Sequence, residues 1–136
     1  IKVTTGLARH KTDRQRQAVL FQGGRHAVSR FRVDETYHGL AARLSCRLET
    51  GRTHQIRVHA THIGHGLIGD PVYGGRRKGA FQKLSEESRM ILAAFERQAL
   101  HAATLGFIHP GTEDPMTFAA PLPADMLTLQ DALQRG

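Results

Sequence analysis

The sequence is poor in cysteine and contains no long hydrophobic run. Cys46 is the only cysteine among 136 residues, so no disulfide can form within the chain, and a reducing, cytoplasmic compartment fits best. No apolar stretch approaches the roughly 18 residues that a membrane-spanning helix needs, so we expect no membrane partner. The composition, 40% hydrophobic and 23% charged, is typical of one globular domain.

Negative charge is scarce in the first part of the chain. Residues 1–80 contain 15 Lys or Arg against 5 Asp or Glu, whereas residues 81–136 contain 4 against 7. Most of these cations are arginines, whose planar guanidinium suits phosphate better than an ammonium does. Such a basic surface is typical of nucleic-acid-binding proteins, but many basic domains bind none. Charge alone therefore leaves a nucleic-acid partner open.

Alternating apolar and polar side chains predict strands in the first half of the chain. Residues 18–21 form a short strand candidate, and residues 27–37 and 40–48 alternate around the turn signal His38-Gly39. The second of these alternating runs carries on its apolar face Leu40, Ala42, Leu44, Cys46 and Leu48. We therefore expect an antiparallel hairpin with Cys46 in the core.

Helical spacing predicts three helices. Residues 53–63 repeat apolar side chains at this spacing, with Thr53 as the N-cap. Residues 85–96 begin at Ser85, a second N-cap, and carry acidic residues in the first turn. Residues 124–134 form a last amphipathic helix.

The remaining segments complete the predicted fold. Residues 66–79 are rich in glycine and predict a long loop, 99–108 a buried strand and 116–119 a short strand. We find no internal repeat and no interdomain linker. The class is α+β, with a mixed, largely antiparallel sheet and a few flanking helices.

Hydrogen-bond donors concentrate where the helix over 53–63 begins. The donors at this helix N-terminus are Arg52, Thr53, His54 and Gln55, and Arg57 lies one turn further. Free backbone N–H groups and a partial positive charge make such a helix end suitable for an anion. An RNA phosphate is one ligand of this kind.

Three other kinds of site compete for this region. His54, His59, His62 and His65 are candidate metal ligands, the last three spaced three residues apart. Paired cysteines and an HExxH motif are absent, so we expect no metal. The spacing Gly64-x-Gly66-x-x-Gly69 resembles a dinucleotide fingerprint, yet it follows a helix rather than a strand, which excludes it. Asp70 precedes a proline in a glycine-rich loop, where an aspartate more often forms a turn than catalyses a reaction.

Three blocks of sequence carry a family resemblance. They are LETGRTHQIRVHATHIGHGLIGDPVYGG at 48–75, RQALHAATLGFIHP at 97–110 and MTFAAPLPADM at 116–126. Their order and spacing resemble the RluA/RluD family of pseudouridine synthases, and most closely its RluD-type branch, over nearly the whole chain. The resemblance implies conversion of uridine to pseudouridine in large-subunit (23S) ribosomal RNA, without cofactor or metal. The target nucleotide would be flipped into a pocket.

The resemblance also implies roles for individual residues. Arg57 is the last residue of GRTHQIR and corresponds to the arginine that pairs with the catalytic aspartate in the family. Arg52, Thr53, His54 and Gln55 belong to the same motif and are expected to contact RNA or to shape the pocket. Leu100, in the ALHA block, is expected to line the uracil pocket.

Two family motifs are missing from this sequence. It contains no HRLD motif, which carries the catalytic aspartate, and neither Tyr37 nor Tyr73 lies in the family's tyrosine motif. We therefore expect residues 1–136 to be the C-terminal portion of a catalytic domain and to be inactive alone. An apolar face left open would favour self-association. The alternative function is a non-catalytic RNA-binding module.

Overall fold

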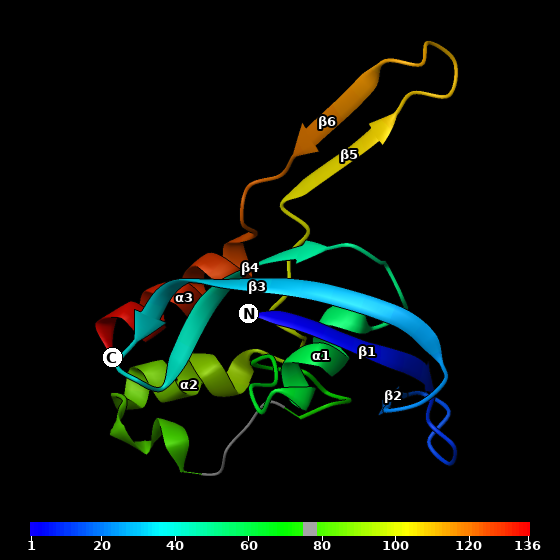
Figure 1. Ribbon diagram of the computed structural model, residues 1–136. Helices are drawn as coiled ribbons and strands as arrows, with labels where there is room; N and C mark the ends of the chain where they lie inside the picture. The colour runs from blue at the N-terminus through cyan, green and yellow to red at the C-terminus, as the bar shows by residue number, and fades with distance from the viewer. Residues whose placement is uncertain (75–78) are drawn as a thin grey trace.

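The computed structural model describes residues 1–74 and 79–136. Its main sheet has the spatial order β2-β1-β3-β4 and consists of β1 (Lys2–Arg9), β2 (Gln17–Leu20), β3 (Arg25–Tyr37) and β4 (Ala41–Leu48). The helices are α1 (Gln55–His62), α2 (Glu86–Ala94) and α3 (Ala124–Arg135), with a 3-10 turn at Ala80–Lys83. In Figure 1, α1 and α2 lie below the sheet. All described strand pairs are antiparallel, which confirms the α+β class.

The hairpin of β3 and β4 forms at the predicted turn. His38 and Gly39 both have positive φ, 52° and 68°, and the amide of Leu40 donates to the carbonyl of Tyr37. Two left-handed residues match the right-handed twist of the flanking strands, which is why a glycine follows the histidine here. A bulge between Val33 and Glu35 then shifts the register of the two strands.

Strand β1 is the one element of the main sheet that the sequence patterns did not identify. It pairs with both β2 and β3, so it is central rather than an edge strand. Val3 and Leu7 are buried, at 6% and 2% exposure, but the polar residues and glycine between them obscure the alternation. The chain therefore places its first residues at the centre of the sheet.

Two hydrophobic clusters hold the elements together. One joins the end of β3 to the α2–α3 pair and consists of Tyr37, Leu84, Leu92, Phe95, Leu129 and Leu133. The other joins the sheet to α1 and consists of Leu7, Ala27, Val58 and Tyr73. Ser85 caps α2 as predicted, since its Oγ accepts from the Ser88 amide at 3.2 Å. The second cluster positions the candidate site.

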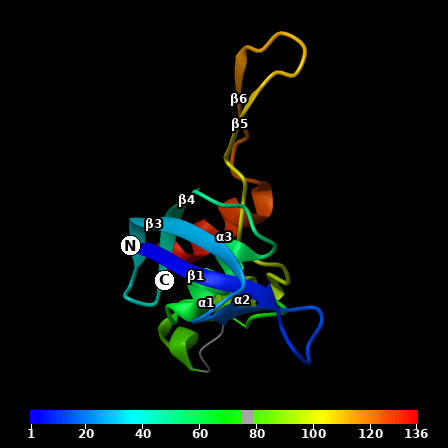
Figure 2. The ribbon, with the colours of Figure 1, turned by 45° about the vertical axis from the view of Figure 1, so that its right-hand side comes forward.

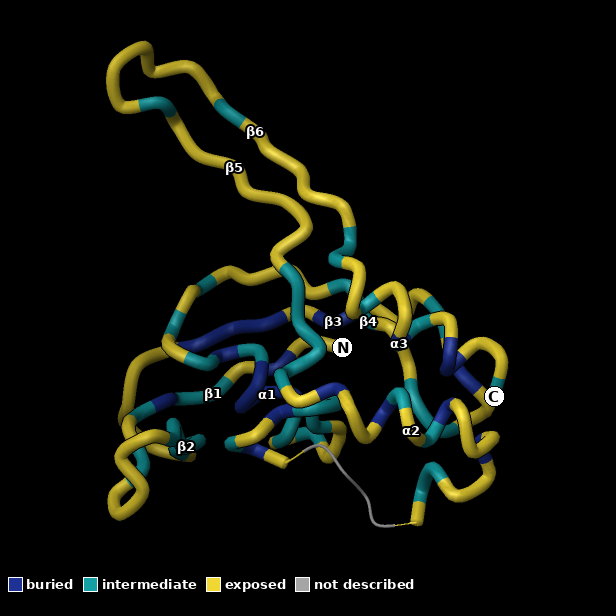
Figure 3. The backbone as a smooth tube through the Cα atoms, turned by 180° about the vertical axis from the view of Figure 1, so that it is seen from behind, coloured by how far each residue is buried: buried dark blue, intermediate teal, exposed yellow. Residues whose placement is uncertain are grey.

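The remaining strands project from this body as a hairpin. β5 (Thr104–Ile108) pairs with β6 (Pro115–Ala119), and Figures 1 and 2 show the pair extending away from the sheet. The prediction of a buried strand over 99–108 is therefore wrong in extent and in burial: Leu105 is 62% exposed, and Figure 3 shows the hairpin as exposed along most of its length. Cys46 is also exposed rather than in the core, because no described layer covers that position of β4.

None of the helices within residues 1–74 and 79–136 has the length and apolar character that crossing a bilayer requires. The predicted loop over 66–79 is described as turns up to Gly74. Its residues 75–78 lie outside the described part of the chain.

Candidate functional site

Arg57 and Asp70 form a buried, two-pronged ion pair. Nε of Arg57 donates to Oδ2 of Asp70 and Nη2 donates to Oδ1, both at 2.8 Å. The side chains are 9% and 1% exposed, respectively. The sequence favoured a turn-forming role for Asp70 and did not predict this pair. Asp70 takes two of the three guanidinium nitrogens, and no described residue accepts a hydrogen bond from the third, Nη1.

The turn after Asp70 explains why its carboxylate is available to Arg57. Oδ1 of Asp70 also accepts from the amides of Val72 at 2.9 Å and Tyr73 at 3.1 Å, which is the turn expected from an aspartate before proline. Gly69 precedes it with φ 77°, and a Cβ there would overlap the carbonyl oxygen of Arg97. The backbone at Gly69 thus packs directly against that of Arg97, and this contact fixes the position of the Asp70 carboxylate.

Electrostatics keep the Arg57–Asp70 pair ionised. Burial alone would raise the pKa of Asp70, but the hydrogen bonds from Arg57 and from the Tyr73 and Val72 amides outweigh it and lower that pKa. The same hydrogen bond to Asp70 raises the pKa of Arg57. The site therefore holds a permanent cation in a fixed orientation.

The ring of Tyr73 covers a second side of the Arg57 guanidinium. The Cζ atom of Arg57 lies 5.1 Å from the ring centroid, and that of Arg16 lies 5.3 Å from it. The Tyr73 hydroxyl accepts from the Gln17 amide at 2.9 Å and lies 2.8 Å from Nδ1 of His54. Tyr73 is 7% exposed, so it holds these groups together inside the protein.

Helix α1 begins in an unusual way, and the prediction of Thr53 as its N-cap is wrong. The N-cap is His54, in the left-handed conformation with φ 55° and ψ 20°, and its side chain makes no cap bond. Instead its ring meets Tyr73 edge on, with centroids 5.6 Å apart. Burial, followed by the charge of Arg57, lowers the pKa of His54. Thr53 is exposed.

Gln55 locks the start of α1 to the sheet. Its Oε1 accepts from the Thr50 hydroxyl at 2.7 Å and the Arg52 amide at 3.0 Å. Its Nε2 donates to the Val28 carbonyl and to Oγ of Ser29, both at 2.9 Å. With 3% exposure and both amide ends occupied by the protein, Gln55 holds the start of α1 against β3.

Arg52 and Leu100 approach the site from different sides. Nε of Arg52 donates to the carbonyl of His26 at 2.9 Å, which ties it to the start of β3. The segment of Leu100 reaches the Asp70 loop, since the amide of Ala99 donates to the carbonyl of Ile68 at 2.8 Å. Leu100 itself is partly buried.

The histidines of α1 do not gather into a metal site. His59 is fully buried, with Nδ1 2.8 Å from Oγ of Ser29 and Nε2 2.8 Å from Oγ1 of Thr5. Its ring nitrogens are thus committed to hydroxyl groups. Among the described residues, no group of three or more His, Cys, Asp or Glu side chains could hold a metal ion.

Comparison with known proteins assigns this arrangement to a family. The family model for RNA pseudouridylate synthase matches residues 1–62, which end with α1 and include Arg57. The ribosomal large subunit pseudouridine synthase D of Xanthomonas campestris pv. campestris is 47% identical over 131 residues, 94% of this chain and 38% of that protein. The proteins of the same name from Haemophilus influenzae and Vibrio parahaemolyticus are 48% and 44% identical and cover 94% and 98% of this chain.

The chain belongs to the RluA/RluD family of pseudouridine synthases. The resemblance seen in the sequence blocks is thereby confirmed. The chain spans about two fifths of the length of the curated relatives it matches. In this chain, the GRTHQIR motif provides the buried Arg57. The GDPVYGG motif provides the Asp70 carboxylate and the Tyr73 ring, which both contact Arg57.

Proposed function

We propose that the protein containing this chain converts uridine to pseudouridine in 23S ribosomal RNA. The observation that carries the proposal is the buried Arg57, which Asp70 fixes along one edge while no described residue accepts a hydrogen bond from Nη1. The names of its relatives support a substrate in the large ribosomal subunit. A ribosomal RNA substrate also favours a cytoplasmic protein.

The proposed reaction is an isomerisation and needs no cofactor. The bond between C1′ and N1 of the uridine breaks, the uracil rotates, and a bond between C1′ and C5 forms. The proton on C5 is lost and N1 gains one, so atoms and electrons balance. Arg57 contributes by holding a catalytic carboxylate ionised and oriented through Nη1.

That carboxylate would come from an HRLD motif outside this sequence. We propose that residues 1–136 form the C-terminal part of the catalytic domain, with Arg57 as its catalytic contribution. Asp70 is a positioning residue, because both of its oxygens are occupied by Arg57 and by the turn amides. The chain alone is then inactive.

Release of tritium from 5-tritiated uridine in 23S RNA tests this proposal. We expect release by the longer protein and none by the 136-residue chain. Release by the chain alone would overturn the division of the site, and Asp70 would be the first candidate for the nucleophile. No release by the longer protein on any RNA would favour the alternative, a module that binds RNA without chemistry.

We also infer that the isolated chain self-associates through apolar groups along β3 and β4. Val33 of β3 and Leu48 of β4 are 53% and 43% exposed, and Ile1, whose backbone pairs with Phe31 of β3, is 74% exposed. Exposed apolar groups clustered on a sheet favour association, because burial removes them from water. Light scattering should show a mass that rises with concentration. A monomer at all concentrations would contradict the inference.

A further inference from the structure

The cations on β3 and β4 are partly paired with carboxylates. Arg30 lies 3.5 Å from Glu49 and Arg32 lies 2.9 Å from Asp34, whereas Arg25 and Arg47 have no carboxylate within 4.0 Å among the described residues. The loop between β1 and β2 differs. Its cations are Lys11, Arg14 and Arg16, and Arg9 is the last residue of β1 before it. In the described part of the chain none of these four has a carboxylate within 4.0 Å. We call residues 9–16 the basic loop.

The basic loop is ordered by its own hydrogen bonds. Nδ1 of His10 accepts from the amides of Thr12 at 3.3 Å and Asp13 at 3.0 Å, and the amide of His10 donates to the Arg16 carbonyl at 2.9 Å. The one carboxylate, Asp13, accepts from the amide of Gln15 at 3.1 Å. A loop held this way loses little conformational freedom when it binds a ligand.

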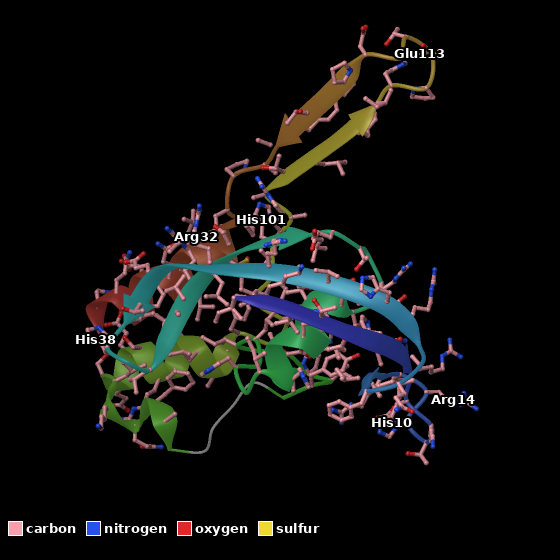
Figure 4. The ribbon with its side chains drawn as sticks, in the orientation of Figure 1. His10, Arg14, Arg32, His38, His101 and Glu113 are labelled. Atoms are coloured by element: carbon pink, nitrogen blue, oxygen red, sulfur yellow. The ribbon has the colours of Figure 1, made fainter. Side chains whose placement is uncertain are left out.

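The base of the basic loop is attached to the candidate site. The guanidinium of Arg16 lies over the ring of Tyr73, 5.3 Å from its centroid, and the neighbouring Gln17 amide donates to the Tyr73 hydroxyl. Tyr73 also contacts Arg57. One ring therefore connects the loop to the site, while Arg14 lies at the outer end, as Figure 4 shows.

Charge and position together identify a ligand for the basic loop. Unpaired arginine and lysine side chains bind phosphates along a nucleic-acid backbone. Nε of Arg16 is buried and has no hydrogen-bond partner among the described residues, so a donor of the loop is unsatisfied beside Tyr73. We propose that the basic loop binds backbone phosphates of the RNA next to the nucleotide held at Arg57, and that Tyr73 sets its distance from that site. This proposal rests on the proposed function.

The test uses the longer protein and two double variants that remove equal charge. Lys11→Gln with Arg14→Gln removes unpaired cations, and Arg30→Gln with Arg32→Gln removes paired ones. RNA affinity is measured against salt concentration. If both loop cations contact phosphates, the slope of log affinity against log salt falls in magnitude by about 1.4, because each single-strand phosphate contributes about 0.7. The KM for RNA should rise more than kcat falls.

The control variant separates this result from a general loss of charge. We expect Arg30→Gln with Arg32→Gln to leave the salt slope near the wild-type value. Equal slope changes in both double variants, or none in the loop variant, would overturn the proposal. If the wild-type protein binds RNA but releases no tritium, the proposed function fails, and the slope comparison still tests the loop.

Discussion

The guanidinium of Arg57 meets the carboxylate of Asp70 edge to edge, with Nε on one oxygen and Nη2 on the other. Because both side chains are nearly out of water, each charge depends on the other for compensation. The pair joins α1 to the turn that follows Asp70. It therefore links the position of the site arginine to the stability of the fold.

Asp70→Ala should be strongly destabilising. It leaves the Arg57 cation buried without a partner, and losing one member of a buried pair costs about 3–5 kcal/mol. Asp70→Asn keeps one carbonyl acceptor and should cost less. Urea unfolding of both variants measures the difference. An Asp70→Ala protein as stable as wild type would show that Arg57 finds other compensation.

Acid should weaken the fold through Asp70. The hydrogen bonds from Arg57 and the turn amides hold its folded-state pKa below the ordinary value of about 3.9. Its contribution to stability is therefore present above that value and is lost as pH falls through the lower, folded pKa. The free energy of unfolding, measured from pH 6 to pH 3, should fall more for wild type than for Asp70→Asn. Parallel curves would exclude Asp70 as a cause.

Arg57→Lys in the longer protein should separate catalysis from binding. Lysine keeps the charge but cannot make the two-pronged contact with Asp70. A displaced cation should lower tritium release by about 100-fold, the typical cost of a 1 Å misplacement. RNA affinity, measured by filter binding, should stay near wild type. Equal losses of turnover and affinity would instead make Arg57 a phosphate-binding residue.

Gly69→Ala and Gly74→Ala form a matched pair. Both glycines have positive φ, 77° and 62°, so alanine is strained at either position. Of the two, only Gly69 would place the new Cβ against backbone, that of Arg97 and Phe95, whereas no described residue lies within 4 Å of a Cβ at Gly74. Gly69→Ala should therefore be more destabilising, by about 1–3 kcal/mol as for other overpacked sites. Equal thermal shifts would show that the two segments can separate at low cost.

His59 should make stability depend on pH near neutrality. Burial, with a smaller effect of His62, lowers its pKa in the folded state, while the unfolded chain binds a proton near pH 6.5. Stability is then full above that value and falls as pH drops below it. His59→Gln should flatten the profile between pH 7.5 and 5.5. A profile equally steep in wild type and His59→Gln would exclude His59 as the cause.

The sequence correctly predicted those features that depend on residues close together in the chain. Ser85 capped α2 as expected, and His38-Gly39 turned the β3–β4 hairpin, because both effects act within a few residues. The failures involve distance in the chain. Thr53 has the chemistry of an N-cap, yet His54 takes that place because its ring packs on Tyr73, 19 residues away. Alternation placed Cys46 on a face but could not say whether another layer covers that face.

The same limit applies to the site. The GRTHQIR motif identified Arg57, Arg52, His54 and Gln55, and the structure brings these together at one end of α1. It could not identify Asp70 as the partner of Arg57. That contact depends on Gly69 letting the turn approach the segment after α2, which no spacing in the sequence reveals.

The projecting hairpin of β5 and β6 should unfold locally before the main sheet does. Among the described residues, β5 and β6 pair only with each other, and a two-stranded hairpin alone is at best marginally stable in water. Backbone amides such as that of Phe118 should therefore exchange with solvent long before those of Val28 in β3, without unfolding of the sheet. If a third strand paired with this hairpin, amide exchange would slow within residues 104–119 alone. The exchange rate of these amides therefore reports whether another segment or molecule is bound to the hairpin.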